Sequence, residues 1–266
     1  MKRIVAMSLA LFLCGCAVSQ QQEVQMGQQY SQELAQQLPM VNDPEVVRYI
    51  NVLGDSIAHV TSRRDLDWHF FVVNSSEVNA FAVPGGYVYV NRGLIERATS
   101  MDELAGVLGH EIGHVVRRHT VKQMQQQQGA NIGITLACIL TSICNNQASG
   151  TAINAGAGAL FAKFSRTDEA QADEEGFKNV VRAGISPEGL VTMFQKLINE
   201  RKSTPGAVDA FFATHPMEED RIADVQRLIN TLSPAELASL TKDSKNFHSF
   251  KSRLASLPPP PPTRAQ

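Results

Sequence analysis

Residues 110–114 constrain this chain more than any other stretch, because they read His-Glu-Ile-Gly-His. On an α-helix the side chains of His110 and His114 lie about 40° apart, and Glu111 lies on the same side. Two neutral imidazoles at this spacing can bind Zn²⁺ while the carboxylate reaches a water molecule at the metal. The stretch therefore predicts a helix with a metal site on one side.

The residues around this motif predict a helix from Leu104 to about His119. Ser100 and Glu103 form a capping-box pair before it. The side opposite the motif is apolar, and a third stripe consists of glycines, which weaken a helix unless another backbone approaches closely. The apolar residues are Met101, Ala105, Leu108, Ile112 and Val115, and the glycines are Gly106, Gly109 and Gly113.

A catalytic zinc needs a third protein ligand. The metzincin class would have Gly and His where this chain has Arg117 and Thr120, so that class is excluded. Glu169 and Asp173 share one face of a later helix, where a gluzincin has its ligand Glu, and Asp173 is in place to orient a ligand imidazole. Acidic pairs at this spacing are also common on solvated helices. His119, on the apolar side of the motif helix, is interpreted as a core histidine.

The composition is that of a globular chain. It has 266 residues, of which 43% are hydrophobic, and 24 basic against 26 acidic side chains give a formal charge of −2. This is enough to bury a core, and the balance gives no electrostatic reason to expect nucleic acid as a partner.

The N-terminus has the pattern of a secretory signal. Lys2 and Arg3 precede the apolar run of residues 4–13, which is too short to span a membrane. Residues 13–16, Leu-Cys-Gly-Cys, resemble the lipobox of bacterial lipoproteins, which predicts a signal peptide over residues 1–15 and acylation of Cys16. The alternative is an ordinary signal peptide containing stray cysteines. Ala17 is not the Asp that retains enterobacterial lipoproteins on the inner membrane, so the resemblance implies an outer-membrane lipoprotein facing the periplasm.

The remaining pattern predicts an α+β fold, mostly helical, with a small antiparallel sheet beside the motif helix. Residues 16–41 are Gln-rich and are expected to form a tether or a solvated helix, and residues 42–257 form the main domain. Helices are expected from Asp43-Pro44, near Asp168, at Ser186-Pro187 and after Pro216. The sheet is expected between residues 68 and 90, and residues 258–266 form a flexible proline-rich tail.

Residues 129–164 are apolar and rich in Gly, Ala and Ser. We expect a buried helix or a lid, and a membrane contact is the alternative. Within this segment Cys138 and Cys144 form either a disulfide or two buried thiols.

Several groups of residues occur in a fixed order along the chain. They are Asn79-Ala80-Phe81-Ala82 with Pro84-Gly85-Gly86, Glu103-Leu104 before residues 110–114, Ser165-Arg166, Glu169 with Ala172-Asp173, and Thr214-His215-Pro216 with Arg221-Ile222. Together they resemble the CAAX-prenyl-protease-like gluzincin metallopeptidases, including the bacterial outer-membrane lipoprotein branch of BepA- and LoiP-type peptidases. The resemblance spans roughly residues 42–230.

This resemblance implies a zincin-type metallopeptidase domain with one Zn²⁺ per chain. The metal ligands would be His110, His114 and Glu169, with Glu111 as the general base that takes a proton from water. His215 would be a fourth ligand that acts as a switch, with a capping or core histidine as the alternative.

Other residues are expected around this site. His215 or Arg221 would otherwise stabilise the transition state, and Asp173 would support a ligand. Asn79, Ala80, Phe81 and Ala82 would form an edge strand that pairs with an extended substrate, or a hairpin of the core.

The main functional hypothesis is a lipid-anchored periplasmic zinc endopeptidase acting on misfolded or unassembled envelope proteins. The alternative is a chaperone or assembly factor for outer-membrane proteins, working with the outer-membrane assembly machinery, in which proteolysis is weak or latent. A structural zinc protein is the weakest reading, because structural sites usually contain Cys ligands.

Overall fold

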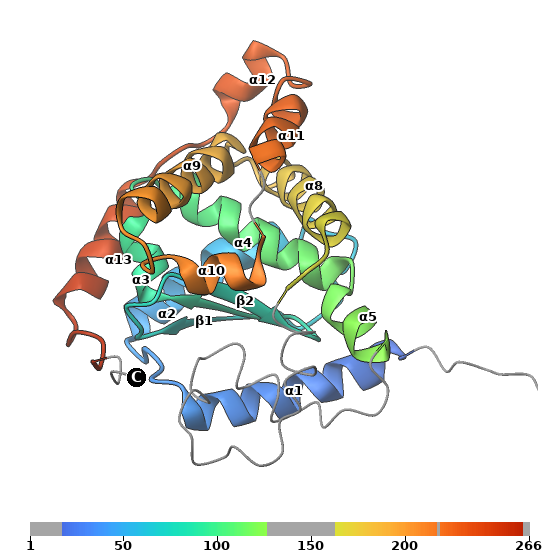
Figure 1. Cartoon of the computed structure of the whole chain (residues 1–266), viewed down its shortest axis with the longest axis vertical. Helices are drawn as coiled ribbons and strands as arrows, with labels where there is room; N and C mark the ends of the chain where they lie inside the picture. Colours follow the sequence, from blue (N-terminus) through green and yellow to red (C-terminus); the bar gives the residue numbers. More distant parts are fainter. Residues whose placement is uncertain (1–17, 127–162, 217–218, 263–266) are drawn as a thin grey trace, which may run out of the picture.

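The computed structural model describes residues 18–126, 163–216 and 219–262 (Figure 1). The predicted signal peptide, Cys16 and nearly all of the segment 129–164, including Cys138 and Cys144, lie outside these ranges. Among the helices that the structure describes, none combines the length and the apolar character needed to cross a bilayer.

Helices dominate the described residues, and the predicted α+β class is confirmed. The elements are α1 (Gln20–Gln37), α2 (Pro44–Ala58), β1 (His69–Val73), β2 (Ala80–Val83), β3 (Tyr87–Asn91), α3 (Arg92–Arg97), α4 (Met101–Val116), α5 (His119–Gln126), α8 (Arg166–Arg182), α9 (Glu188–Ser203), α10 (Asp209–Thr214), α11 (Glu219–Ile229), α12 (Pro234–Ser239) and α13 (Lys245–Ser256). As predicted, α2 begins after Asp43, whose side chain caps it. Helix α8 begins at Arg166, capped by the side chain of Ser165, two residues before the predicted start near Asp168.

The sheet is mixed, which corrects the prediction of an antiparallel sheet. Its strand order is β1-β3-β2, in which β2 and β3 form an antiparallel hairpin and β1 lies parallel to β3. The hairpin turn uses Gly85 and Gly86, both at positive φ. Alternation of apolar residues looks the same for both strand directions, so the sequence pattern did not reveal that β3 inserts between β1 and β2.

Both faces of this sheet are covered. Helices α2 and α4 contact one face, and their apolar residues share a core with Phe70, Val88 and Val90. Helix α1 lies along the other side of the sheet (Figure 1), where Leu34 joins a second apolar cluster that includes Phe81. A three-stranded sheet covered on both faces is a rigid support for the helix that carries the motif.

Helix α4 is the centre of the fold, in contact with α2, α8, α9 and the sheet (Figure 1). Every residue from Met101 to Val115 is buried. The helix ends at Val116, three residues earlier than predicted, because Arg118 adopts a positive φ of 56° and the chain turns into α5. The predicted capping box is not formed, since the Glu103 carboxylate accepts the backbone N–H of Thr99 at 2.7 Å.

The buried carboxylate of Glu23 ties α1 to the end of α4. It accepts from Arg63 Nη1 and from Arg118 Nε, each at 2.7 Å. Arg118 also donates to the carbonyl of Val18 at 2.6 Å, just before α1. The turn after the motif helix is therefore fixed by the N-terminal helix.

Glycines bring α8 unusually close to α4. A Cβ atom at Gly113 would lie 2.7 Å from the carbonyl oxygen of Ala172, and one at Gly176 would lie 3.0 Å from the amide nitrogen of His110. This is the close backbone approach that the glycine stripe on α4 required. It brings the residues of α8 within side-chain reach of the motif.

We predict that Gly113→Ala moves α8 away from α4, because the added methyl group would meet backbone rather than a flexible side chain. The free energy of unfolding should fall by about 1–3 kcal/mol in chemical denaturation, and affinity for the metal ion expected at the motif should fall with it. As a control, Ala170→Gly on the exposed side of α8 should cost about 1 kcal/mol through helix propensity alone and leave metal affinity unchanged. Wild-type metal affinity in Gly113→Ala would contradict the prediction.

Candidate metal centre

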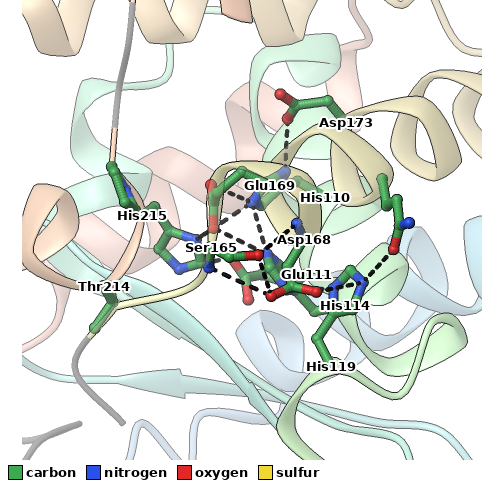
Figure 2. A network of polar contacts seen from close by, with 12 residues as sticks. His110, Glu111, His114, His119, Ser165, Asp168, Glu169, Asp173, Thr214 and His215 are labelled. Carbon is green, nitrogen blue, oxygen red and sulfur yellow. Dashed lines mark hydrogen bonds and ion pairs between the residues drawn. The ribbon is translucent and has the colours of Figure 1, made fainter. Parts of the chain in front are cut away.

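Three separate parts of the chain meet at one buried cluster (Figure 2). Helix α4 supplies His110 and His114, α8 supplies Glu169, and His215 follows the end of α10. One ligand atom from each of these four residues lies within 4.8 Å of all the others, and all four side chains are buried. The structure thus brings together the three expected ligands and the expected fourth histidine.

The nitrogen and oxygen atoms of this cluster converge on a common point. His110 Nε2 lies 3.1 Å from His114 Nε2 and 3.3 Å from His215 Nδ1. The nearer Glu169 oxygen, Oε1, lies 3.3 Å from His215 Nδ1 and 3.5 Å from His114 Nε2. These donors are the imidazole and carboxylate atoms with which proteins bind zinc.

The hydrogen bonds behind the two motif histidines assign their tautomers. Asp173 Oδ1 lies 2.8 Å from His110 Nδ1, and a carboxylate only accepts, so this Nδ1 carries the proton. His119 Nε2 lies 3.0 Å from Gln171 Oε1 and therefore donates. His119 Nδ1 then accepts the proton of His114 Nδ1 at 3.0 Å. Both Nε2 atoms in the cluster are left as bare lone pairs.

Two lone pairs at 3.1 Å repel each other unless a cation lies between them. A proton on His114 is disfavoured, because burial lowers the pKa of His114 to about 3. The residues of the cluster therefore fit a metal ion. His110 and His114 could bind it in the tautomers that their hydrogen bonds assign, with the proton on Nδ1 and Nε2 free.

Glu169 and Asp173 are buried, not solvated. Burial by itself raises the pKa of Glu169, but His215, His114 and Arg221 outweigh it and hold this pKa well below its usual value. Arg221 donates to both oxygens of Asp173 at 2.8 Å, and its Nη1 lies 2.5 Å from Glu169 Oε2. One guanidinium thus contacts both carboxylates, and together with the neighbouring histidines it favours their ionised forms.

Glu111 lies beside the cluster and outside the set of four. Its Oε1 is 3.4 Å from His215 Nε2 and makes no hydrogen bond among the described residues. Burial raises the pKa of Glu111, against the lowering effect of His215 and His110. A buried carboxylate with a raised pKa and a free oxygen is suited to accept and return a proton.

The residues of the expected substrate strand are not members of the metal cluster. Residues 80–83 form β2, the edge strand that contacts α4, and Asn79 precedes it with its side-chain oxygen buried and without a hydrogen bond among the described residues. Phe81 packs into the apolar cluster with Leu34 and Met124. The acylation site Cys16 lies outside the described residues.

Three residues near the site were missed in the sequence. His119 was interpreted as a core residue, yet it contacts His114, as does Phe164, whose ring stacks on His114 with the centroids 4.0 Å apart. Gln171 was not considered. Its position gave no signal, because two residues after Glu169 a helix turns a side chain about 200° away from the face that Glu169 and Asp173 share. The turn at Arg118 that brings His119 back to the motif likewise has no signature in the sequence.

Comparison with known proteins agrees with this geometry. A family model described as Peptidase family M48 matches residues 44–229, which include every residue of the cluster. The beta-barrel assembly-enhancing protease of Escherichia coli (strain K12) is 32% identical over 246 residues, which cover 90% of this chain and 49% of that protein. This chain therefore spans about half the length of that relative.

Two further relatives extend the comparison. Metalloprotease LoiP of Escherichia coli (strain K12) is 26% identical over 243 residues, covering 84% of this chain and 94% of that protein. The mitochondrial metalloendopeptidase OMA1 of Schizosaccharomyces pombe is 29% identical over 178 residues, covering 67% of this chain and 51% of that protein. The resemblance to BepA- and LoiP-type peptidases is confirmed.

Proposed function

The chain belongs to peptidase family M48, and on that premise we propose that it is a zinc-dependent endopeptidase that cuts misfolded or unassembled envelope proteins. The observation that carries this proposal is the pair of bare Nε2 atoms on His110 and His114, 3.1 Å apart, facing the buried Glu169 carboxylate. Relatives named metalloprotease support the same chemistry.

We propose His110, His114 and Glu169 as the protein ligands of one Zn²⁺. When bound, zinc polarises a peptide carbonyl and lowers the pKa of water. Glu111 then takes a proton from the attacking water and returns it to the leaving amine. The raised pKa of Glu111 suits this exchange, because it makes the carboxylate a better proton acceptor.

Arg221 is proposed as an orienting residue. Its Nε and Nη2 donate to Asp173, and its Nη1 donates to the carbonyl of Pro216 at 3.0 Å while lying against Glu169. Because every nitrogen of the guanidinium has a partner, Arg221 is a poor candidate for an oxyanion donor. Asp173 passes this orientation on to His110.

Extended polypeptides are the proposed substrates. The edge strand β2 contacts α4, so a chain that pairs with residues 79–82 would run alongside the helix that carries Glu111. Pairing through the backbone makes few demands on sequence. This supports unfolded or unassembled proteins as substrates.

An alternative proposal is a chaperone or assembly factor for outer-membrane proteins with weak or latent proteolysis. It is favoured by one observation, the name of the 32% identical relatives, which are called beta-barrel assembly-enhancing proteases. In this alternative, loss of Glu111 would leave the assembly function intact.

For the cellular location we propose the outer membrane, with the protein facing the periplasm and held there by acylated Cys16. The lipobox-like residues 13–16 support this location. They precede α1 directly, and α1 is joined to the end of α4 through Glu23.

We also propose that His215 makes the resting enzyme latent. Its ring is buried against Glu169 and His110, with Nε2 turned toward Glu111. It thus occupies the space between the proposed ligands and the proposed base, where the attacking water would have to lie. Displacement of His215 would then be needed for activity.

We predict that Glu111→Gln keeps its zinc but loses at least about 100-fold in peptidase activity, because only the base is removed. Casein cleavage and zinc content of the chain starting at Ala17 would measure both effects. The matched variant Glu169→Ala should instead lose zinc, since two imidazoles leave the ion under-coordinated. Full activity in Glu111→Gln would refute the proposed mechanism.

We predict that Cys16→Ala releases the protein from the membrane and leaves peptidase activity unchanged, because anchoring and chemistry reside in different segments. Fractionation of cells after salt and carbonate washes measures the release. A Cys14→Ala variant is the control and should remain in the membrane fraction. Retention of Cys16→Ala in that fraction would show that another segment holds the protein.

We predict that His215→Ala raises casein cleavage at unchanged zinc content, because removal of the imidazole frees the space beside Glu111. Zinc content and cleavage rate would be measured on the same preparation. A loss of activity with zinc retained would end the proposal of latency and assign His215 to transition-state stabilisation.

A further inference from the structure

We infer that His119 and Gln171 form a relay that orients the metal ligand His114 and fixes its tautomer. The relay runs from the Gln171 carboxamide oxygen to His119 Nε2 at 3.0 Å, and from His119 Nδ1 to His114 Nδ1 at 3.0 Å. It rests on the proposed metal site and assigns that site two positioning residues.

The two ligand histidines are supported differently. His110 is held by the carboxylate of Asp173, which Arg221 orients. Among the described residues no carboxylate contacts His114 Nδ1, which uses the imidazole of His119 as its acceptor. A second histidine provides an acceptor without adding a negative charge, in a cluster that already buries Glu169 and Asp173.

The tautomer of His119 decides whether this support works. If the proton of His119 were on Nδ1, this N–H would point at the N–H of His114 Nδ1. The proton of His114 would then have to move to Nε2, the atom that faces the proposed metal. The Gln171 oxygen at 3.0 Å opposes this, because it accepts a proton from Nε2, and Asp168 Oδ1, at 3.6 Å from the same nitrogen, favours the same tautomer. Gln171 therefore acts on His114 through His119, without touching the cluster itself.

His119 is not a further ligand of the proposed metal. It is hydrogen-bonded to His114 Nδ1. This atom lies on the opposite side of the ring from Nε2, which faces His110 and Glu169. Phe164 stacks on the His114 ring and restricts its rotation, so the His119 bond acts on a ring with little freedom. The position of His119 itself depends on the turn at Arg118, which Glu23 and the Val18 carbonyl hold.

The test measures the dissociation constant of Zn²⁺ alone, by competition with a chelator of known affinity, on the full chain in detergent. His119→Leu removes the acceptor at similar volume and should raise the dissociation constant about 10- to 100-fold. His119→Asn keeps an oxygen acceptor near the position of Nδ1 and should return it to within about fivefold of wild type.

A double-mutant cycle tests the relay itself. Gln171→Leu should raise the dissociation constant severalfold in the wild-type background and cause no further change in the His119→Leu background, because the relay is then already broken. Gln171 is only partly buried, so this variant tests the proposal even if His119→Leu does not fold. The melting temperature of each metal-free variant reports any structural effect separately.

Three outcomes would overturn the relay: wild-type affinity in His119→Leu, no rescue by His119→Asn, or additive effects of the two leucine variants. Failure of the wild-type chain to bind Zn²⁺ would be a different result, because it refutes the proposed metal site. The proposed peptidase function is tested separately by Glu111→Gln, which should lose peptidase activity at unchanged zinc affinity.

Discussion

The close approach of α4 and α8 is the constraint on which the metal cluster depends. Gly113 and Gly176 let the two backbones approach to a distance that a Cβ atom on either helix would prevent. Only at this separation does the short Glu169 side chain reach both motif histidines, while Asp173, one turn later, reaches His110 from behind. The glycines cost helix propensity, and burial of α4 on all sides offsets that cost.

Charge balance gives the cluster its second constraint. The carboxylates of Glu169 and Asp173 are both buried and held ionised, and within the described residues Arg221 is the guanidinium that contacts them. Buried charges are costly unless they are paired. A divalent cation at the converging Nε2 atoms would pair with the buried carboxylate of Glu169 and remove the repulsion between the two lone pairs.

The support of the site extends beyond the motif helix. Glu23 on α1 fixes the turn at Arg118, that turn directs His119 back to His114, and Gln171 on α8 completes the relay. Helix α1 and the metal centre are thus joined by consecutive buried contacts. The N-terminal helix carries few apolar residues and yet contributes to the geometry of the site.

The sequence by itself determined the parts that depend on local order. These are the motif helix, its glycine stripe, the cap of α2, the shared face of Glu169 and Asp173, and the family. Helical periodicity and capping act over a few residues, so they can be predicted without the fold.

Tertiary structure alone decided the position of β3 between β1 and β2, the end of α4 at Val116 and the return of His119 to His114. It also brought His215 into the cluster from a part of the chain about a hundred positions away. Each of these depends on contacts between distant segments, namely the strand pairing, the Glu23–Arg118 ion pair and the packing around α10. No local pattern encodes such contacts, because the residues that make them are neighbours only after the chain has folded.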